Sequence, residues 1–99
     1  METRLRKTEK CDIIICLSHI GYKYRTDKVC DLQLAERTYD TDLIIGGHTH
    51  TFLSEPVIVK NKSRREILVN QVGCYGINLG RIDFYLDDKI TASGTRILV

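Results

Sequence analysis

The sequence predicts an α/β fold, and three observations lead to that expectation. Two aliphatic runs, at 12–17 and 42–46, have the length and β-branched character of buried strands. Between them, about 27–38, apolar residues recur every three or four positions, as on one face of a helix. The rest of the chain alternates short extended segments with turn residues. We therefore expect a βαβ unit followed by a β-hairpin and further strands.

The helix over about 27–38 should bury a single stripe. Either Thr26 or Asp27 can cap its N-terminus. The apolar positions of this stripe are Val29, Leu32, Ala35 and Tyr39. The charged positions expected on the other faces are Lys28, Asp31, Glu36 and Arg37.

The second half of the chain is predicted to be built from strands and turns. The expected strands are 57–60, 65–70, 79–86 and about 89–98. They are separated by a turn at 61–64, a tight glycine-containing loop at 73–76 and a turn at Asp87-Asp88. No internal repeat or linker divides residues 1–99, so we expect one domain or a part of one.

Composition excludes few functions, but it gives no support to nucleic-acid binding or to membrane binding. The formal net charge of +2 gives no reason to expect binding to nucleic acid or to an anionic membrane. No apolar run has the length of a membrane-spanning helix. The basic N-terminus precedes only a short apolar run that contains Asp12, so we expect a solvated helix end or a fraying tail rather than a signal peptide. Localisation is left unassigned.

The four cysteines, Cys11, Cys16, Cys30 and Cys74, form no Cys-x-x-Cys pair. A cysteine-ligated zinc site is therefore not expected. We expect reduced, mostly buried thiols that act as small hydrophobic side chains.

All three histidines fall in two short motifs that follow the aliphatic runs. The first is Ser18-His19-Ile20-Gly21, and the second is Gly46-Gly47-His48-Thr49-His50. The two strands of a βαβ unit are parallel, so both motifs should meet at the C-terminal edge of the sheet, where α/β proteins bind ligands. Because histidine is the commonest metal ligand, we expect a metal site formed by His19, His48 and His50.

In an extended loop, His48 and His50 would face the same cleft and Thr49 would point away. Gly46 and Gly47 would allow the backbone to approach a ligand or another segment closely. The alternative is a polar loop whose histidines only form hydrogen bonds, and His19 on its own is a weak indication of a site.

Four segments together resemble the calcineurin-like metallophosphoesterases, most closely their 5′-nucleotidase branch. They are Cys11–Tyr22, Asp42–His50, Val69–Gly76 and Leu79–Asp83. The resemblance implies an αββα sandwich of which residues 1–99 form the C-terminal part of a single catalytic domain. It also implies two divalent metal ions, such as zinc, manganese or iron, and a phosphate-ester or nucleotide substrate.

The same resemblance implies a role for each matched residue. His19 and His48 match ligands of the second metal, and His50 matches a ligand of the first. Gly73, Tyr75 and Gly76 match a loop at the rim of the site, whereas Asn70 and Gln71 receive no role. In such sites two metal ions activate a water and bind the phosphoryl oxygens.

The acidic motifs of the family are absent from this sequence. The pattern includes Asp-x-His, Gly-Asp and Asn-His-Asp/Glu motifs before the Ser-His-x-Gly motif, whereas Asp12, Asp40 and Asp42 precede the two strands. Neutral imidazoles alone do not compensate two dications. We therefore expect at most partial metal occupancy, little or no activity of the isolated chain, and dependence on a missing N-terminal segment or on self-association.

Two alternatives remain open from the sequence. The three histidines could hold a single zinc ion in a metal-binding or interaction module, because three histidines and a water form a known zinc arrangement. The chain could also be an inactive remnant of such a domain.

Overall fold

A four-stranded sheet forms the centre of the computed structural model, which describes residues 1–86 and 90–98, with side chains for 1–86. Its strands are β1 (Ile15–Leu17), β2 (Leu43–Ile45), β3 (Val57–Lys60) and β4 (Glu66–Asn70), in the order β1-β2-β4-β3. The helix α1 (Asp31–Arg37) connects β1 to β2, which are parallel. The predicted βαβ unit is therefore confirmed.

The predicted hairpin is present, but its second strand lies inside the sheet. β4 pairs antiparallel with β3 and parallel with β2, where Ile45 lies opposite Asn70. Its last four residues are buried, as expected for an interior strand, whereas β3 alternates partly buried and exposed residues as an edge strand does. This placement brings the end of β4 to the same sheet edge as both histidine motifs.

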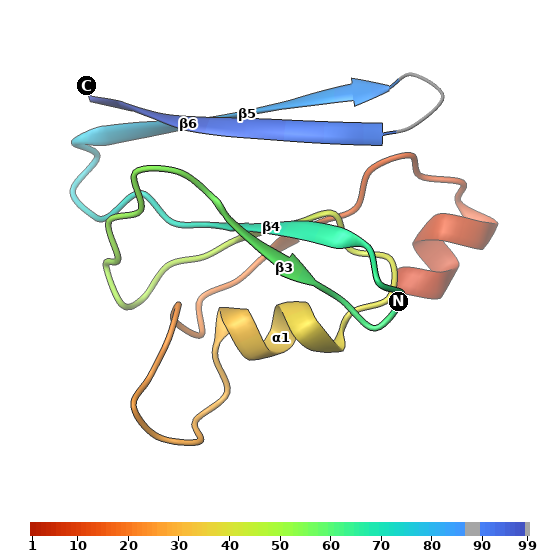
Figure 1. Ribbon diagram of the computed structural model, residues 1–99, viewed down its shortest axis with the longest axis horizontal. Coiled ribbons are helices and arrows are strands. Elements are labelled where there is room, and N and C mark those ends of the chain that lie inside the picture. The colour runs from red at the N-terminus through yellow and green to blue at the C-terminus, as the bar shows by residue number, and fades with distance from the viewer. Residues whose placement is uncertain (87–89, 99) are drawn as a thin grey trace.

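A two-stranded ribbon lies on the face of the sheet opposite α1 (Figure 1). It consists of β5 (Asn78–Leu86) and β6 (Ile90–Leu98), which pair antiparallel. Both predicted strands are confirmed to within one residue, and the Asp87-Asp88 turn lies outside the described residues.

The core lies between α1 and the sheet. Its fully buried members are Ala35, Ile44, Ile67 and Val69. The opposite face is only partly covered, because Ile15 and Ile45 remain 48% and 42% exposed. A cavity of about 370 Å³ separates this face from Ile82 and Phe84 of β5.

The helix α1 begins at Asp31, four residues after the predicted start at about residue 27, and Cys30 is its N-cap. The backbone N–H of Asp31 donates to the carbonyl of Gly21 at 2.7 Å, and that of Leu32 donates to Tyr22 at 3.4 Å. The loop that follows His19 therefore satisfies the helix amides that Thr26 or Asp27 was expected to cap.

The predicted buried stripe is correct only at its centre. Ala35 is fully buried and Leu32 packs against the core, but Val29 and Tyr39 are 51% and 53% exposed. Asp31 was expected on another face, yet it is 0% exposed. Because the helix begins later, Val29 lies before it, and the fully buried positions of its first and second turns are Asp31 and Ala35.

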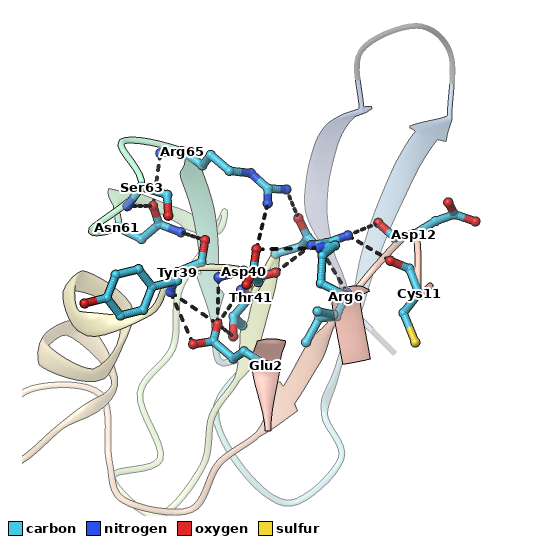
Figure 2. Close-up of polar contacts among 12 residues, drawn as sticks. Glu2, Arg6, Cys11, Asp12, Tyr39, Asp40, Thr41, Asn61, Ser63 and Arg65 are labelled. Atoms are coloured by element: carbon cyan, nitrogen blue, oxygen red, sulfur yellow. Dashed lines mark hydrogen bonds and ion pairs between the residues drawn. The ribbon is translucent and has the colours of Figure 1, made fainter. Parts of the chain in front are cut away.

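A network of charged side chains closes the N-terminal ends of β1 and β2 (Figure 2). Asp42 is 7% exposed and accepts hydrogen bonds of 2.8 Å from Arg6, from Arg65 and from the backbone N–H of Ile14. Arg6 belongs to a single π-helical turn, η1 (Arg4–Thr8), and also donates to the carbonyl of Asp40 at 2.6 Å. We call Glu2, Arg6, Asp40, Asp42 and Arg65 the charged clasp.

Glu2 joins this clasp through one carboxylate. It accepts hydrogen bonds from the backbone N–H groups of Tyr39, Asp40 and Thr41 and from the hydroxyl of Thr41 (Figure 2). Burial raises the pKa of Glu2, but these hydrogen bonds together outweigh it and hold that pKa below its usual range. The segment is helical and has no buried residue, as the expectation of a solvated helix end requires, but it is not a fraying tail, because it makes specific long-range contacts.

Two smaller expectations concern the cysteines and the membrane. All four thiols are free as predicted, but only Cys30 is buried and the others are partly exposed. Among the described residues, no helix has both the length and the apolar character needed to cross a bilayer.

Candidate functional site

Both histidine motifs begin at the same edge of the sheet. Leu17 lies opposite Ile45 in the parallel register of β1 and β2, and the backbone N–H of Ser18 donates to the carbonyl of Ile45 at 2.9 Å. Gly46 in turn donates to the carbonyl of Asn70 at 2.9 Å. The loops that follow β1 and β2 are thus tied to neighbouring strand ends, which is how parallel strands create a ligand-binding edge.

The loops bring two of the three histidine rings together. The ring centroids of His19 and His48 lie 5.1 Å apart with an edge-on angle of 72° between planes. The ring of His50 lies against Tyr75, at 6.1 Å and 59°. All three histidines are exposed to solvent. The rings therefore divide into a pair and a single one, and each is open to a ligand.

The backbone of the second motif is not extended, so that expectation was wrong. His48 and His50 have φ values of 72° and 51°, and the N–H of Thr49 donates to the carbonyl of Gly47 at 2.9 Å. For residues other than glycine, this left-handed conformation costs about 1–2 kcal/mol each. Thr49 does not simply point away, because its hydroxyl accepts the backbone N–H of Tyr22 at 3.1 Å. The loop is therefore strained and is held to the first histidine loop.

Two glycines let the histidine loops pack closely, as expected for Gly46 and Gly47. A Cβ atom on Gly47 would lie 3.0 Å from Nδ1 of His19. A Cβ atom on Gly46 would overlap the carboxylate of Asp31. Side chains at these positions would push apart the segments that bring His19 and His48 together. Their part in approaching a ligand stays a prediction.

The loop at 73–76 is tight, with Gly73, Tyr75 and Gly76 at φ values of 92°, 63° and 69°. A Cβ atom on Gly73 would overlap the ring of Phe52, so this position requires glycine for space as well as for conformation. Tyr75 is 90% exposed and its ring lies beside His50. The loop thus lies next to the single histidine, and its role as a site rim stays a prediction.

A buried carboxylate lies beneath both histidine loops. Asp31 accepts a hydrogen bond from the hydroxyl of Ser18, and its second oxygen, Oδ2, is buried without a protein partner. Burial raises the pKa of Asp31, although the Ser18 hydrogen bond partly opposes this. Across the described part of the chain, no three His, Cys, Asp or Glu side chains are grouped so as to hold a metal ion. Asp31 contacts Ser18, whereas the histidine ligands predicted from the sequence lie in the exposed loops.

Known proteins match nearly the whole length of this chain. The trifunctional nucleotide phosphoesterase protein YfkN of Bacillus subtilis (strain 168) is 40% identical over 85 residues, which are 86% of this chain and 5% of that protein. The 5′-nucleotidase of Rattus norvegicus is 30% identical and matches 94% of this chain and 18% of its own length. No family model matches the chain.

A solved structure agrees with these relatives in fold and in sequence. The 5′-nucleotidase precursor from Thermus thermophilus superposes with a TM-score of 0.79 and 28% identity, covering 94% of this chain and 20% of that one. The chain belongs to the 5′-nucleotidase-like metallophosphoesterases. This confirms the family resemblance that the motifs carry and the α/β fold class.

The chain corresponds to only a small part of the relatives that it matches. The chain spans less than a fifth of the length of the curated relatives described above. The family is metal-dependent and its named members here are phosphoester hydrolases acting on nucleotides.

Sequence reasoning missed three polar residues at the sheet edge that carries the histidine loops. Asp31 was placed on an outer helix face, although its position among Cys30, Leu32 and the buried Ala35 is a sign that could have found it. Gln71 received no role, yet it is 3% exposed and directly follows a buried strand. Thr49, expected to point away, links both loops. Buried polar side chains at strand ends are the general signal.

Proposed function

We propose that this chain contributes the imidazole ligands of a two-metal phosphoesterase site that hydrolyses nucleotide-type phosphate esters. His19 and His48 would bind one divalent ion and His50 the other. The observation that carries the proposal is the pairing of the His19 and His48 rings from two loops that are distant in sequence.

The spacing of that ring pair fits ligation of one ion. With Zn–N bonds of about 2.0–2.1 Å and a tetrahedral angle, two bound imidazoles would have centroids roughly 5 Å apart. The centroids of His19 and His48 are 5.1 Å apart. The fit supports imidazole donors suited to zinc, iron or a similar divalent ion.

The position of the third ring favours two ions over one. His50 lies against Tyr75, while His19 and His48 lie against each other. A single-zinc module would need all three imidazoles around one ion. The division of the rings into a pair and a single one therefore supports the two-metal proposal over the mono-zinc alternative.

Charge requires a further part of the site. Three imidazoles are neutral ligands, and two dications need negative ligands nearby. We propose that these carboxylates come from a further segment of the family domain, with residues 1–99 acting as one part of that domain. The chain alone should then bind metal incompletely and hydrolyse esters poorly.

The residues of this chain would position a substrate rather than perform the hydrolysis alone. In such sites two divalent ions supply activation of the attacking water and neutralisation of the phosphoryl oxygens. The imidazoles of His19, His48 and His50 would hold the ions. The exposed ring of Tyr75 beside His50 offers a stacking surface to a nucleobase, which supports a nucleotide substrate.

The test uses the fact that the chain has only three histidines, so its imidazole NMR signals report on this site alone. On zinc titration of the full chain, we expect the signals of His19 and His48 to shift together and that of His50 to shift independently. His19→Ala should abolish the shared shift and leave the shift of His50.

Three results would contradict the proposal in different ways. If no histidine signal shifts at millimolar zinc, the chain has no metal site of the proposed kind. A single transition shared by all three histidines would favour the mono-zinc module. Two ions per chain together with hydrolysis of a nucleoside 5′-monophosphate by the isolated chain would overturn the requirement for further carboxylates.

A further inference from the structure

Gln71 contacts the loop that carries His48 and His50 at both of its ends. Its amide oxygen accepts the backbone N–H of Thr51, and its amide nitrogen donates to the carbonyl of Gly47 at 3.1 Å. One planar group thus joins the residue before His48 to the residue after His50. Its backbone carbonyl also accepts the N–H of Leu53 at 3.0 Å, which fixes the chain just beyond the loop.

The position of Gln71 in the fold makes these contacts rigid. It directly follows β4, whose last residue, Asn70, lies opposite Ile45 of β2. The residue is only 3% exposed, so water has little access to its hydrogen bonds. The amide therefore projects from a buried strand end into the loop that follows the neighbouring strand.

The loop that Gln71 holds has a conformation that needs external support. His48 and His50 both adopt left-handed φ values, at 72° and 51°. Strained residues of this kind persist where the surrounding structure fixes them, and they cluster at functional sites. The contacts of Gln71 with Gly47 and Thr51 provide this support from both sides.

The contact extends to the first histidine loop. The amide nitrogen of Gln71 lies 3.4 Å from the hydroxyl of Thr49, which accepts the backbone N–H of Tyr22 at 3.1 Å. A chain of polar contacts therefore runs from β4 through both loops. The two loops that it links are those that carry His19 and His48, whose rings lie 5.1 Å apart.

We propose that Gln71 is a positioning residue of the histidine site, which sets the His48 ring against that of His19 and holds His50 apart from them. This inference rests on the proposed function for its metal ligands, but not for the loop geometry itself. Glutamine suits this position because the loop presents a carbonyl at Gly47 and an N–H at Thr51, and the two ends of one side-chain amide meet both.

Two variants separate the two ends of the amide. Gln71→Glu keeps the acceptor for Thr51 and loses the donor for Gly47, whereas Gln71→Met keeps the length and loses both. Gln33→Met is the matched control, because Gln33 is a partly buried glutamine on α1. Each is compared with wild type in the full chain.

The first measurement needs no metal. Amide hydrogen exchange at Thr51 should accelerate in Gln71→Met, stay slow in Gln71→Glu and be unchanged in Gln33→Met. The NOE between the His19 and His48 rings should weaken in both Gln71 variants. Unchanged exchange and an unchanged NOE in Gln71→Met would overturn the inference.

The second measurement is zinc affinity. Residues that orient metal ligands typically change affinity about 10–100-fold when they are replaced, and we expect a loss in this range for Gln71→Met, which adds no charge to the site. Variants that melt at lower temperature yet keep wild-type zinc affinity and ring contact would show a merely structural role and overturn the inference. If Gln71→Met does not fold, the metal-free NOE between the His19 and His48 rings in the near-isosteric Gln71→Glu decides.

The two proposals fail separately. If wild-type chain binds no zinc, the proposed function is wrong, and the exchange and NOE measurements still decide the role of Gln71. If zinc binds and the Gln71 variants match Gln33→Met in every readout, the proposed function stands and the positioning role is wrong.

Discussion

The two ends of the parallel strands β1 and β2 are organised in opposite ways. At their N-terminal ends the charged clasp pairs Asp42 with two arginines and surrounds the carboxylate of Glu2 with donors. At their C-terminal ends the loops hold exposed imidazoles, left-handed histidines and a buried Asp31 oxygen without a protein partner. At the clasp end the carboxylates of Asp42 and Glu2 each accept several hydrogen bonds, although the Nε of Arg6 is left without one, whereas the other end keeps strained residues and open ligands, as functional sites do.

Two carboxylates express the same contrast as opposite pKa shifts. Burial raises the pKa of Glu2, but its hydrogen bonds outweigh that and lower it overall. Burial raises the pKa of Asp31, and its single hydrogen bond from Ser18 does not offset this. Glu2 is thus stabilised as an anion and Asp31 is not, because the number of donors differs.

The largest effect should come from removing the central anion of the clasp. Asp42→Ala leaves Arg6 and Arg65 only their longer ion pairs with Asp40, at 3.9 Å, and because Asp42 is buried while Arg65 is partly exposed, we place the cost at the lower end of the range for breaking a buried pair, about 3 kcal/mol. We expect a loss of this size in the free energy of unfolding measured with urea. The exposed Arg81–Asp83 pair provides the control, and Asp83→Ala should cost under about 1 kcal/mol. Equal losses of unfolding free energy in Asp42→Ala and Asp83→Ala would contradict the difference between the buried clasp and an exposed ion pair.

The next effect tests the crowding at the histidine end. In Gly46→Ala, the new methyl group overlaps Asp31, which should cost about 1–3 kcal/mol of unfolding free energy. Adding Asp31→Ala should relieve part of that cost, so the two changes are coupled by more than about 0.5 kcal/mol. Gly76→Ala has open space around its Cβ, and its cost should not respond to Asp31→Ala. Additive behaviour of the Gly46 and Asp31 variants would show that the overlap is relieved elsewhere.

The pH dependence should have opposite signs at the two ends. The stability that Glu2 contributes is present above its ordinary pKa and is lost as the pH falls through its lowered pKa. The contribution of Asp31 is present below its ordinary pKa and is lost as the pH rises through its raised pKa. Unfolding free energies from about pH 3 to about pH 7 measure both.

In those measurements, Glu2→Gln should lower stability near neutral pH by about 1 kcal/mol and flatten the acidic limb. Asp31→Asn should gain stability relative to wild type as the pH rises. The same slope change in both variants would mean that the two carboxylates do not differ in the way described.

The smallest effect concerns the link between the two histidine loops. Thr49→Val removes the acceptor of the Tyr22 N–H and should cost about 0.5–1 kcal/mol. Amide exchange at Tyr22 should accelerate with it. Thr26→Val, in the exposed loop before α1, is the control and should leave that exchange rate unchanged. A slow Tyr22 amide in Thr49→Val would place the link between the loops in other contacts.

Much of the sheet edge could be predicted from local sequence. The runs that end at Leu17 and Ile45 have strand character, and a helical pattern between them requires parallel strands. This places His19 near His48 without any structure. The start of the helix could not be predicted in the same way, because the backbone of Gly21 and Tyr22, rather than a nearby side chain, caps it.

The sequence by itself determined the family, the order of the elements and the edge at which the histidines meet. The family follows from the resemblance of four motif segments, whereas hydrophobic period and glycine position, which are local properties, suffice for the order of the elements and for the shared edge. Only the tertiary structure decided that His48 and His50 are left-handed, that Asp31 is buried and that Glu2 and Arg6 hold the strand ends. These depend on contacts between residues far apart in the chain, where packing and long-range hydrogen bonds override local preference.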